Sequence, residues 1–117
     1  MRSLSPISKR SFLAGAVALT AILLWASVSR EASELAAVGP HWLPHLVSFA
    51  LLAFAWTLGV PRAPTLLVAL AVIAFGFAHE AIEILGHAHG YELADAITDG
   101  VGAACGALVA HIAKALA

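Results

Sequence analysis

The chain is a succession of four long apolar segments joined by shorter polar connections. The apolar segments cover residues 11–28, 44–60, 65–85 and 95–116. The eighteen residues of the first segment extend about 27 Å as an α-helix, which is enough to cross a thin bilayer. Gly39-Pro40 and the stretch from Pro61 to Pro64 are turn signals. The pattern predicts an all-α fold, a transmembrane four-helix bundle whose second and third spans form an antiparallel hairpin.

The N-terminal residues admit two interpretations. Residues 1–10 are polar and basic and lead directly into the first apolar segment. The stretch from Ser8 to Leu13, SKRSFL, approximates a twin-arginine export signal with lysine in the first position. No clean A-x-A cleavage site follows Val28, which favours a retained helix over a cleaved signal. We expect a cytoplasmic basic N-terminus, residues 1–10, and one four-span transmembrane domain, residues 11–117.

The Lys and Arg residues predict how the bundle is oriented. Cytoplasmic connections of membrane proteins carry an excess of Lys and Arg. An N-in/C-in orientation leaves Arg30 as the one cation outside and places the others on the cytoplasmic side: Arg2, Lys9, Arg10, Arg62 and Lys114. We therefore expect both termini on the cytoplasmic side.

Composition agrees with a membrane location and excludes other classes. Hydrophobic residues make up 62 % of the 117 residues and charged residues only 11 %, which is too apolar for a soluble domain of this size. The net charge of −1 and the absence of a long basic tract argue against nucleic-acid binding. A single cysteine, Cys105, excludes an internal disulfide.

Ionisable residues are concentrated in the stretch from His79 to Gly100. It holds five of the seven carboxylates and three of the six histidines. A charged side chain at the bilayer centre costs about 2.5–3.5 kcal/mol, whereas each Leu, Ile, Val or Phe returns only about 0.3–0.6 kcal/mol. The stretch must therefore lie near an interface, be paired or protonated, or hold a ligand.

The predicted topology brings ionisable residues of three spans to the outer leaflet. His45 lies about one turn into the second span, Glu80 in the last turns of the third, and Asp95 at the start of the fourth. These three are the candidate catalytic centre, with a histidine and a neighbouring carboxylate as acid–base groups. A divalent metal ion is the cofactor that the surrounding donors would suit, with the candidate ligands Glu80, Glu83, Asp95, Asp99 and His89.

Structural roles compete with each of these assignments. Asp95 can serve as a helix cap, Glu83 can reach the lipid headgroups, and His87 and His89 can be solvated loop residues. Glu80 and His45 lie deeper, where an ionisable residue is a functional-site hypothesis by default. In the fourth span, Gly102 and Gly106 form a G-x-x-x-G pair, which predicts close helix packing.

Several of these residues resemble the pattern of the VanZ-like family of small bacterial membrane proteins. His45, in LPHLVSFALLAF, matches the histidine that opens one span in that family; Glu80 matches the glutamate that ends the next span. Asp95, fifteen residues later, matches the aspartate of the last span, and Gly102-Ala103 with Gly106 match its closing glycines. The resemblance covers about residues 40–112.

The chain departs from the family pattern at four positions. His41 stands where the family has aspartate, Glu83 where it has glutamine, His89 where it has arginine and Asp99 where it has asparagine. The exchanges replace amide and guanidinium groups by carboxylate and imidazole. The resemblance implies a four-helix protein of the bacterial cytoplasmic membrane, from a family named for a member linked to teicoplanin-type glycopeptide resistance.

Four functions are compatible with this sequence. The first is action on cell-envelope or lipid-linked substrates at the outer leaflet, with membrane lipids as the surroundings and a lipid-linked precursor as partner. The second is a non-enzymatic accessory subunit of a larger membrane complex, whose acid and histidine pairs only lock the spans together. A proton or ion path is disfavoured because the acids occupy one leaflet, and haem ligation because His45 and His79 lie at different depths.

Overall fold

The computed structural model describes residues 5–29, 39–87 and 92–116. The described residues form four α-helices and no strand: α1 (Pro6–Val28), α3 (Trp42–Gly59), α4 (Thr65–His87) and α5 (Leu93–Leu116). All four are long and apolar enough to cross a membrane. The all-α prediction is confirmed, and the protein is a multi-pass helical membrane protein.

Helix α1 begins five residues before the apolar segment that predicts it. Ser5 caps the helix by accepting a hydrogen bond from the Ser8 backbone N–H at 3.1 Å, and Pro6 occupies the first helical position. The cap places Lys9 and Arg10 inside the helix, in its first turns. One end of α1 is therefore basic.

The second and third spans form the predicted hairpin. A tight turn over residues 60–64 joins α3 to α4, with the Ala63 N–H donating to the Val60 carbonyl at 3.0 Å. The Val68 N–H then donates to the Pro64 carbonyl at 3.1 Å, which closes the first turn of α4. Proline at this position restricts the backbone and sets the start of the new helix.

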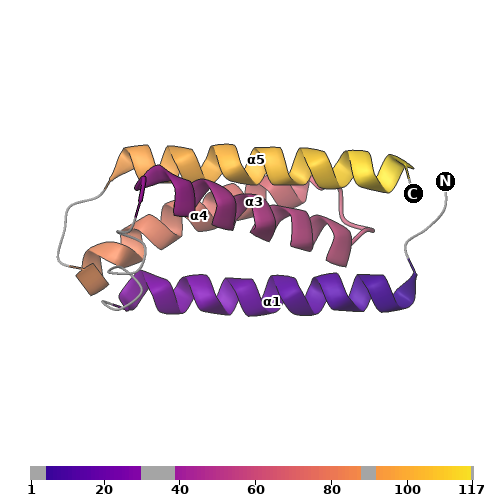
Figure 1. Cartoon of the computed structure of the whole chain (residues 1–117), viewed down its shortest axis with the longest axis horizontal. Coiled ribbons are helices and arrows are strands. Elements are labelled where there is room, and N and C mark those ends of the chain that lie inside the picture. The colour runs from indigo at the N-terminus through magenta and orange to yellow at the C-terminus, as the bar shows by residue number, and fades with distance from the viewer. Residues whose placement is uncertain (1–4, 30–38, 88–91, 117) are drawn as a thin grey trace.

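Helices α3 and α5 run side by side in the same direction and approach closely (Figure 1). A Cβ at Gly102 would collide with the carbonyl oxygen of Leu46, and a Cβ at Gly106 with that of Ala50. Only glycine permits this approach of the two backbones. The packing role predicted for the G-x-x-x-G pair is confirmed.

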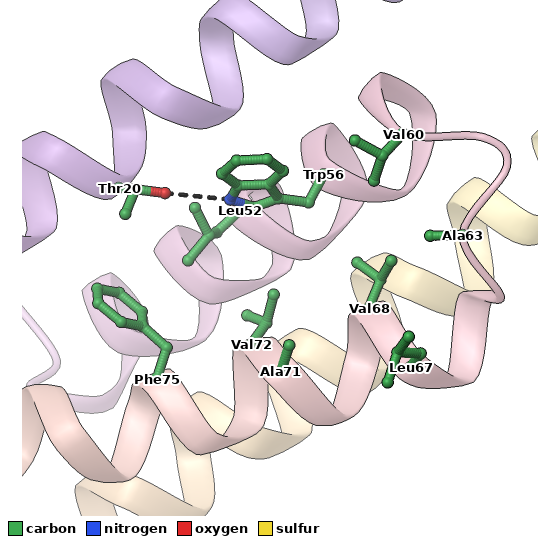
Figure 2. Close-up of a pocket in the computed structure, with 10 residues that line it drawn as sticks. All are labelled: Thr20, Leu52, Trp56, Val60, Ala63, Leu67, Val68, Ala71, Val72 and Phe75. Atoms are coloured by element: carbon green, nitrogen blue, oxygen red, sulfur yellow. Dashed lines mark hydrogen bonds between the residues drawn. The ribbon is translucent and has the colours of Figure 1, made fainter.

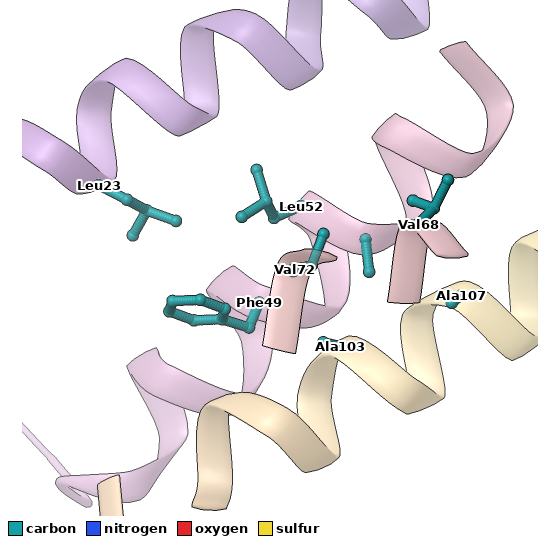
Figure 3. Packing of buried hydrophobic residues seen from close by; sticks show 8 residues of the cluster. Leu23, Phe49, Leu52, Val68, Val72, Ala103 and Ala107 are labelled. Carbon is teal, nitrogen blue, oxygen red and sulfur yellow. The ribbon is translucent and has the colours of Figure 1, made fainter. Parts of the chain in front are cut away.

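Helix α4 packs against both α5 and α3. Helix α1 packs on α3 and α4 and forms the outer layer opposite α5 (Figure 1). The apolar core between the layers comes from all four helices and contains Leu23, Phe49, Leu52, Ala53, Val68, Val72, Ala103 and Ala107 (Figure 3). Many large apolar side chains, such as Leu66 and Leu108, face outward instead. Outward-facing apolar residues suit a helix bundle surrounded by lipid.

The bundle has two different ends. The N-terminal end of α1, the α3–α4 turn and the C-terminal end of α5 lie together at one end (Figure 1). The other end contains the last turns of α1 and α4 and the first turns of α3 and α5. The candidate site residues lie at this second end.

Candidate functional site

Ionisable side chains from three helices and a serine from the fourth gather where α3 and α5 begin. We name this group the polar cluster; its members are Ser27, His41, His45, His79, Glu80, Glu83, Glu92, Asp95 and Asp99. His79, Glu80, Asp95 and Asp99 are buried. Buried ionisable groups are costly unless they are paired, so their partners determine what the cluster can do.

Two histidine–aspartate pairs join α3 to α5. His41 Nε2 lies 2.9 Å from Asp95 Oδ2, and His45 Nδ1 lies 2.8 Å from Asp99 Oδ1. The ring nitrogen is the donor in each pair because a carboxylate only accepts. Both histidines and both aspartates are four residues apart, so each set shares one helix face. The two parallel helices are thereby paired in register.

The inner of these two pairs is shielded from solvent and the outer one is open. The side chain of His41 is 63 % exposed, whereas that of His45 is 12 % exposed. The second ring nitrogen of His45, Nε2, lies 3.6 Å from Asp95 Oδ2. The bond to Asp99 therefore orients the His45 ring and leaves Nε2 facing Asp95.

Among the described residues, two buried carboxylates each have one oxygen atom without a hydrogen-bond partner. Glu80 Oε1 accepts from the backbone N–H of Glu92 at 3.2 Å, but Glu80 Oε2 has no partner among the described residues. Asp99 Oδ2 is likewise unpaired within the described part of the chain. Both side chains are fully buried. An unsatisfied buried acceptor costs about 1–3 kcal/mol, so these atoms are suited to a proton or a cation.

A second contact set links α1 to α4. His79 Nδ1 lies 2.6 Å from Ser27 Oγ, and His79 Nε2 lies 2.9 Å from Glu83 Oε1. The rings of Phe49 and Phe75 lie 5.7 Å and 6.3 Å from the His79 ring, between their centroids. His79 thus contacts α1 through Ser27, while Glu80 reaches the start of α5 through the Glu92 N–H.

Two groups of side chains in the cluster can hold a metal ion. One consists of His41, His45 and Asp95, and the other of Glu80, Glu92 and Asp95. In each group the ligand atoms all lie within 4.8 Å of one another. Carboxylate and imidazole donors suit divalent cations. Asp95 belongs to both groups and is therefore the ligand common to the two candidate sites among the described residues.

The predicted metal ligands do not all belong to one of these two groups. Glu80 and Asp95 belong to one of the groups, whereas Glu83 pairs with His79 and Asp99 with His45. His89 lies outside the described residues. The three candidate catalytic residues all lie in the cluster, and Asp95 is the third residue of α5 rather than a residue before the helix.

No family model, no curated protein and no solved structure matches this chain. The resemblance to the VanZ-like family thus depends on the short motifs around His45, Glu80 and Asp95, and family membership stays a prediction.

Sequence reasoning did not select His41, His79 or Glu92 as site residues. His41 precedes the apolar segment and was noted only as a departure from the family pattern. Its spacing from His45 repeats that of Asp95 and Asp99, and this matching four-residue spacing is the signal that points to it. Glu92 immediately precedes α5. Its backbone N–H donates to Glu80, and its side chain lies 3.6 Å from His41 Nε2. No local pattern marks that role.

Proposed function

We propose that this chain is a VanZ-like protein of the bacterial cytoplasmic membrane whose polar cluster acts at the outer face on cell-envelope or lipid-linked substrates. The observation that carries the proposal is the pair of fully buried carboxylates, Glu80 and Asp99, each with an oxygen unpaired among the described residues. A cluster that served only to join helices would be more stable if these oxygen atoms had hydrogen-bond partners. The unpaired oxygens of Glu80 and of Asp99, the partner of His45, favour a site that binds a proton or a cation.

The proposed orientation is N-in/C-in. Lys9 and Arg10 in the first turns of α1, Arg62 in the α3–α4 turn and Lys114 in the last turn of α5 belong to the end opposite the cluster. Cations favour the cytoplasmic side, so the cluster would face outward. The cluster would then lie on the side of the membrane that faces the cell envelope.

We propose a divalent cation held by Asp95 with His41 and His45, one of the two groups whose ligand atoms lie close together. Bound there, the ion would polarise a phosphoryl or carbonyl oxygen of the substrate or activate a water molecule. Asp99 holds the Nδ1 proton of His45, which leaves His45 Nε2 to bind the ion or to accept a proton. Asp99 is thus a positioning residue, and Glu80 supplies negative charge from the α4 side.

Complementation in the host tests this proposal. A strain lacking the gene is compared with the wild type for growth on a teicoplanin-type glycopeptide and for the composition of its lipid-linked envelope precursors. His45→Ala and Glu80→Ala should abolish complementation at unchanged membrane abundance, while the control His111→Ala, at the opposite end of α5, should complement fully. Wild-type behaviour of both cluster variants would remove the catalytic role.

One set of contacts favours a second candidate, a non-enzymatic accessory subunit. The pairs His41–Asp95 and His45–Asp99 join α3 to α5, and Ser27–His79 joins α1 to α4, so the cluster also fastens the bundle. Purification at native expression level distinguishes the two functions. Stoichiometric co-elution with a larger membrane complex, together with full complementation by His45→Ala, would support the subunit.

A further inference from the structure

A cavity of about 360 Å³ lies between α1 and the α3–α4 hairpin (Figure 2). Its size falls in the range of small-molecule sites, which is about 300–1,000 Å³. The lining is almost entirely hydrocarbon and includes Leu52, Trp56, Leu67, Val72 and Phe75. A ligand that fills it must therefore be apolar.

The polar atoms beside the cavity are already paired. The Trp56 indole N–H donates to Thr20 Oγ1 at 3.1 Å, and the Thr20 hydroxyl donates to the Ala16 carbonyl at 2.8 Å (Figure 2). An ordered water needs two to four polar partners, and this lining does not offer them. The cavity is suited to a hydrocarbon chain rather than to water.

The cavity belongs to the half of the bundle away from the polar cluster. Val60 and Ala63 line it at the α3–α4 turn, and Phe75 lines it at its inner end (Figure 2). The Phe75 ring contacts those of Phe49 and His79, with centroids 5.9 Å and 6.3 Å away, and so separates the cavity from the cluster. From Leu67 to Phe75 the helix rises about 12 Å, which gives the cavity an elongated shape along α4.

Three cations lie on the segments that meet at the same end of the bundle as the α3–α4 turn (Figure 1). A Cβ at Gly59 would lie 2.8 Å from Leu13 N, so this part of α1 touches the end of α3. Lys9 and Arg10 lie about one turn beyond that contact, and Arg62 follows Gly59 by three residues. None of these three cations takes part in an ion pair among the described residues, whose carboxylates all belong to the polar cluster. This end of the bundle therefore favours an anion.

We propose that the cavity binds one acyl chain of an anionic phospholipid, with the headgroup at Lys9, Arg10 and Arg62. The surrounding membrane supplies hydrocarbon chains at this depth, and the unpaired cations select an anionic headgroup from the same leaflet. The bound chain fills the space that α1 leaves against the hairpin, so this lipid stabilises the docking of α1. The site is independent of whether the polar cluster binds a cation.

Trp56 reports on this site directly because it lines the cavity. The full chain carrying Trp25→Phe and Trp42→Phe, two exposed positions, keeps Trp56 as its sole tryptophan. It is reconstituted in vesicles of unlabelled phosphatidylcholine that contain a low mole fraction of lipid brominated along the acyl chain. Brominated phosphatidylglycerol should quench Trp56 about threefold more than brominated phosphatidylcholine at the same mole fraction. A matched variant that keeps only Trp25, on the lipid-facing surface, should show no such preference.

Two substitutions in the Trp56-only protein test the two parts of the site. Ala71→Phe fills the cavity and should abolish the selective quenching, while the control Leu70→Phe, on the lipid-facing side of α4, should leave it unchanged. Arg62→Gln should reduce quenching by phosphatidylglycerol toward that by phosphatidylcholine without occupying the cavity, so headgroup selection is tested even if Ala71→Phe does not fold. Equal quenching by the two lipids, no quenching of Trp56, or undiminished selectivity in a folded Ala71→Phe protein would each overturn the proposal.

Discussion

The two halves of this bundle differ in the share of polar side-chain contacts that join the helices. In the half with the polar cluster, hydrogen-bonded pairs such as His45–Asp99 and Ser27–His79 join the helices. Toward the other end, α3 and α5 meet backbone to backbone at Gly106, and α1 touches α3 at Gly59. Apolar burial alone does not drive helix association in lipid, so small-residue packing and interhelical hydrogen bonds take its place. Both mechanisms extend along the bundle: Gly102 meets the Leu46 backbone beside the polar cluster, and single hydrogen bonds such as Trp56–Thr20 join helices in the other half.

The largest expected effect comes from the glycine contact. Gly106→Ala places a Cβ against the Ala50 backbone, which no side-chain rotation can relieve, so we expect a loss of about 3 kcal/mol or more in the free energy of unfolding. Titration with SDS in mixed micelles measures this quantity. Gly100→Ala is the matched control on α5, since its Cβ meets only Ile73 at 3.7 Å, and it should change stability by less than about 1 kcal/mol. Equal effects of the two substitutions would mean that α3 and α5 are not in this close contact.

A smaller effect on the free energy of unfolding should distinguish the inner histidine–aspartate pair from the outer one. Asp99→Ala leaves the shielded His45 ring without its acceptor and should cost about 1–3 kcal/mol. Asp95→Ala leaves His41, which is exposed to solvent, and should cost about 0.5 kcal/mol. The same SDS titration compares the two variants, with Asp99→Asn as the control that retains an acceptor oxygen. A larger loss of stability in Asp95→Ala than in Asp99→Ala would contradict the finding that His45–Asp99 is the more buried pair.

A further effect, smaller than that of Asp99→Ala, concerns the interhelical hydrogen bond beside the cavity. Trp56→Phe removes the bond to Thr20 and should cost about 0.6 kcal/mol, the average for such bonds between transmembrane helices. A double-mutant cycle with Thr20→Val isolates the pairwise energy. Strict additivity of the two substitutions would show that α1 is not fastened to α3 at this point.

The fold follows from the sequence more completely than the site does. The sequence predicts four helices from the apolar segments, a hairpin from the turn signals, and close helix packing from the pair Gly102 and Gly106. Each of these features depends on local composition or spacing. The start of α1 differs from its prediction because the Ser5 cap, and not hydrophobicity, sets it.

The site was predictable only as far as topology determines it. Alternating spans bring His45, Glu80 and Asp95 to one end whatever the helix rotations are. The partners of each group depend on those rotations and on the register of α3 against α5, which backbone contacts at Gly102 and Gly106 set. His41 and Glu92 acquire their contacts through this register, so no hydropathy pattern could identify them.

Titration of the purified protein with Mn²⁺, followed by the loss of the free-ion EPR signal, tests the central claim that Asp95 is the centre of a cation site. The wild type should bind one ion per chain, and Asp95→Asn should abolish binding because Asp95 belongs to both ligand groups. His111→Ala, at the opposite end of α5, should retain it. An absence of binding by the wild type, or binding that survives in Asp95→Asn, would contradict the account.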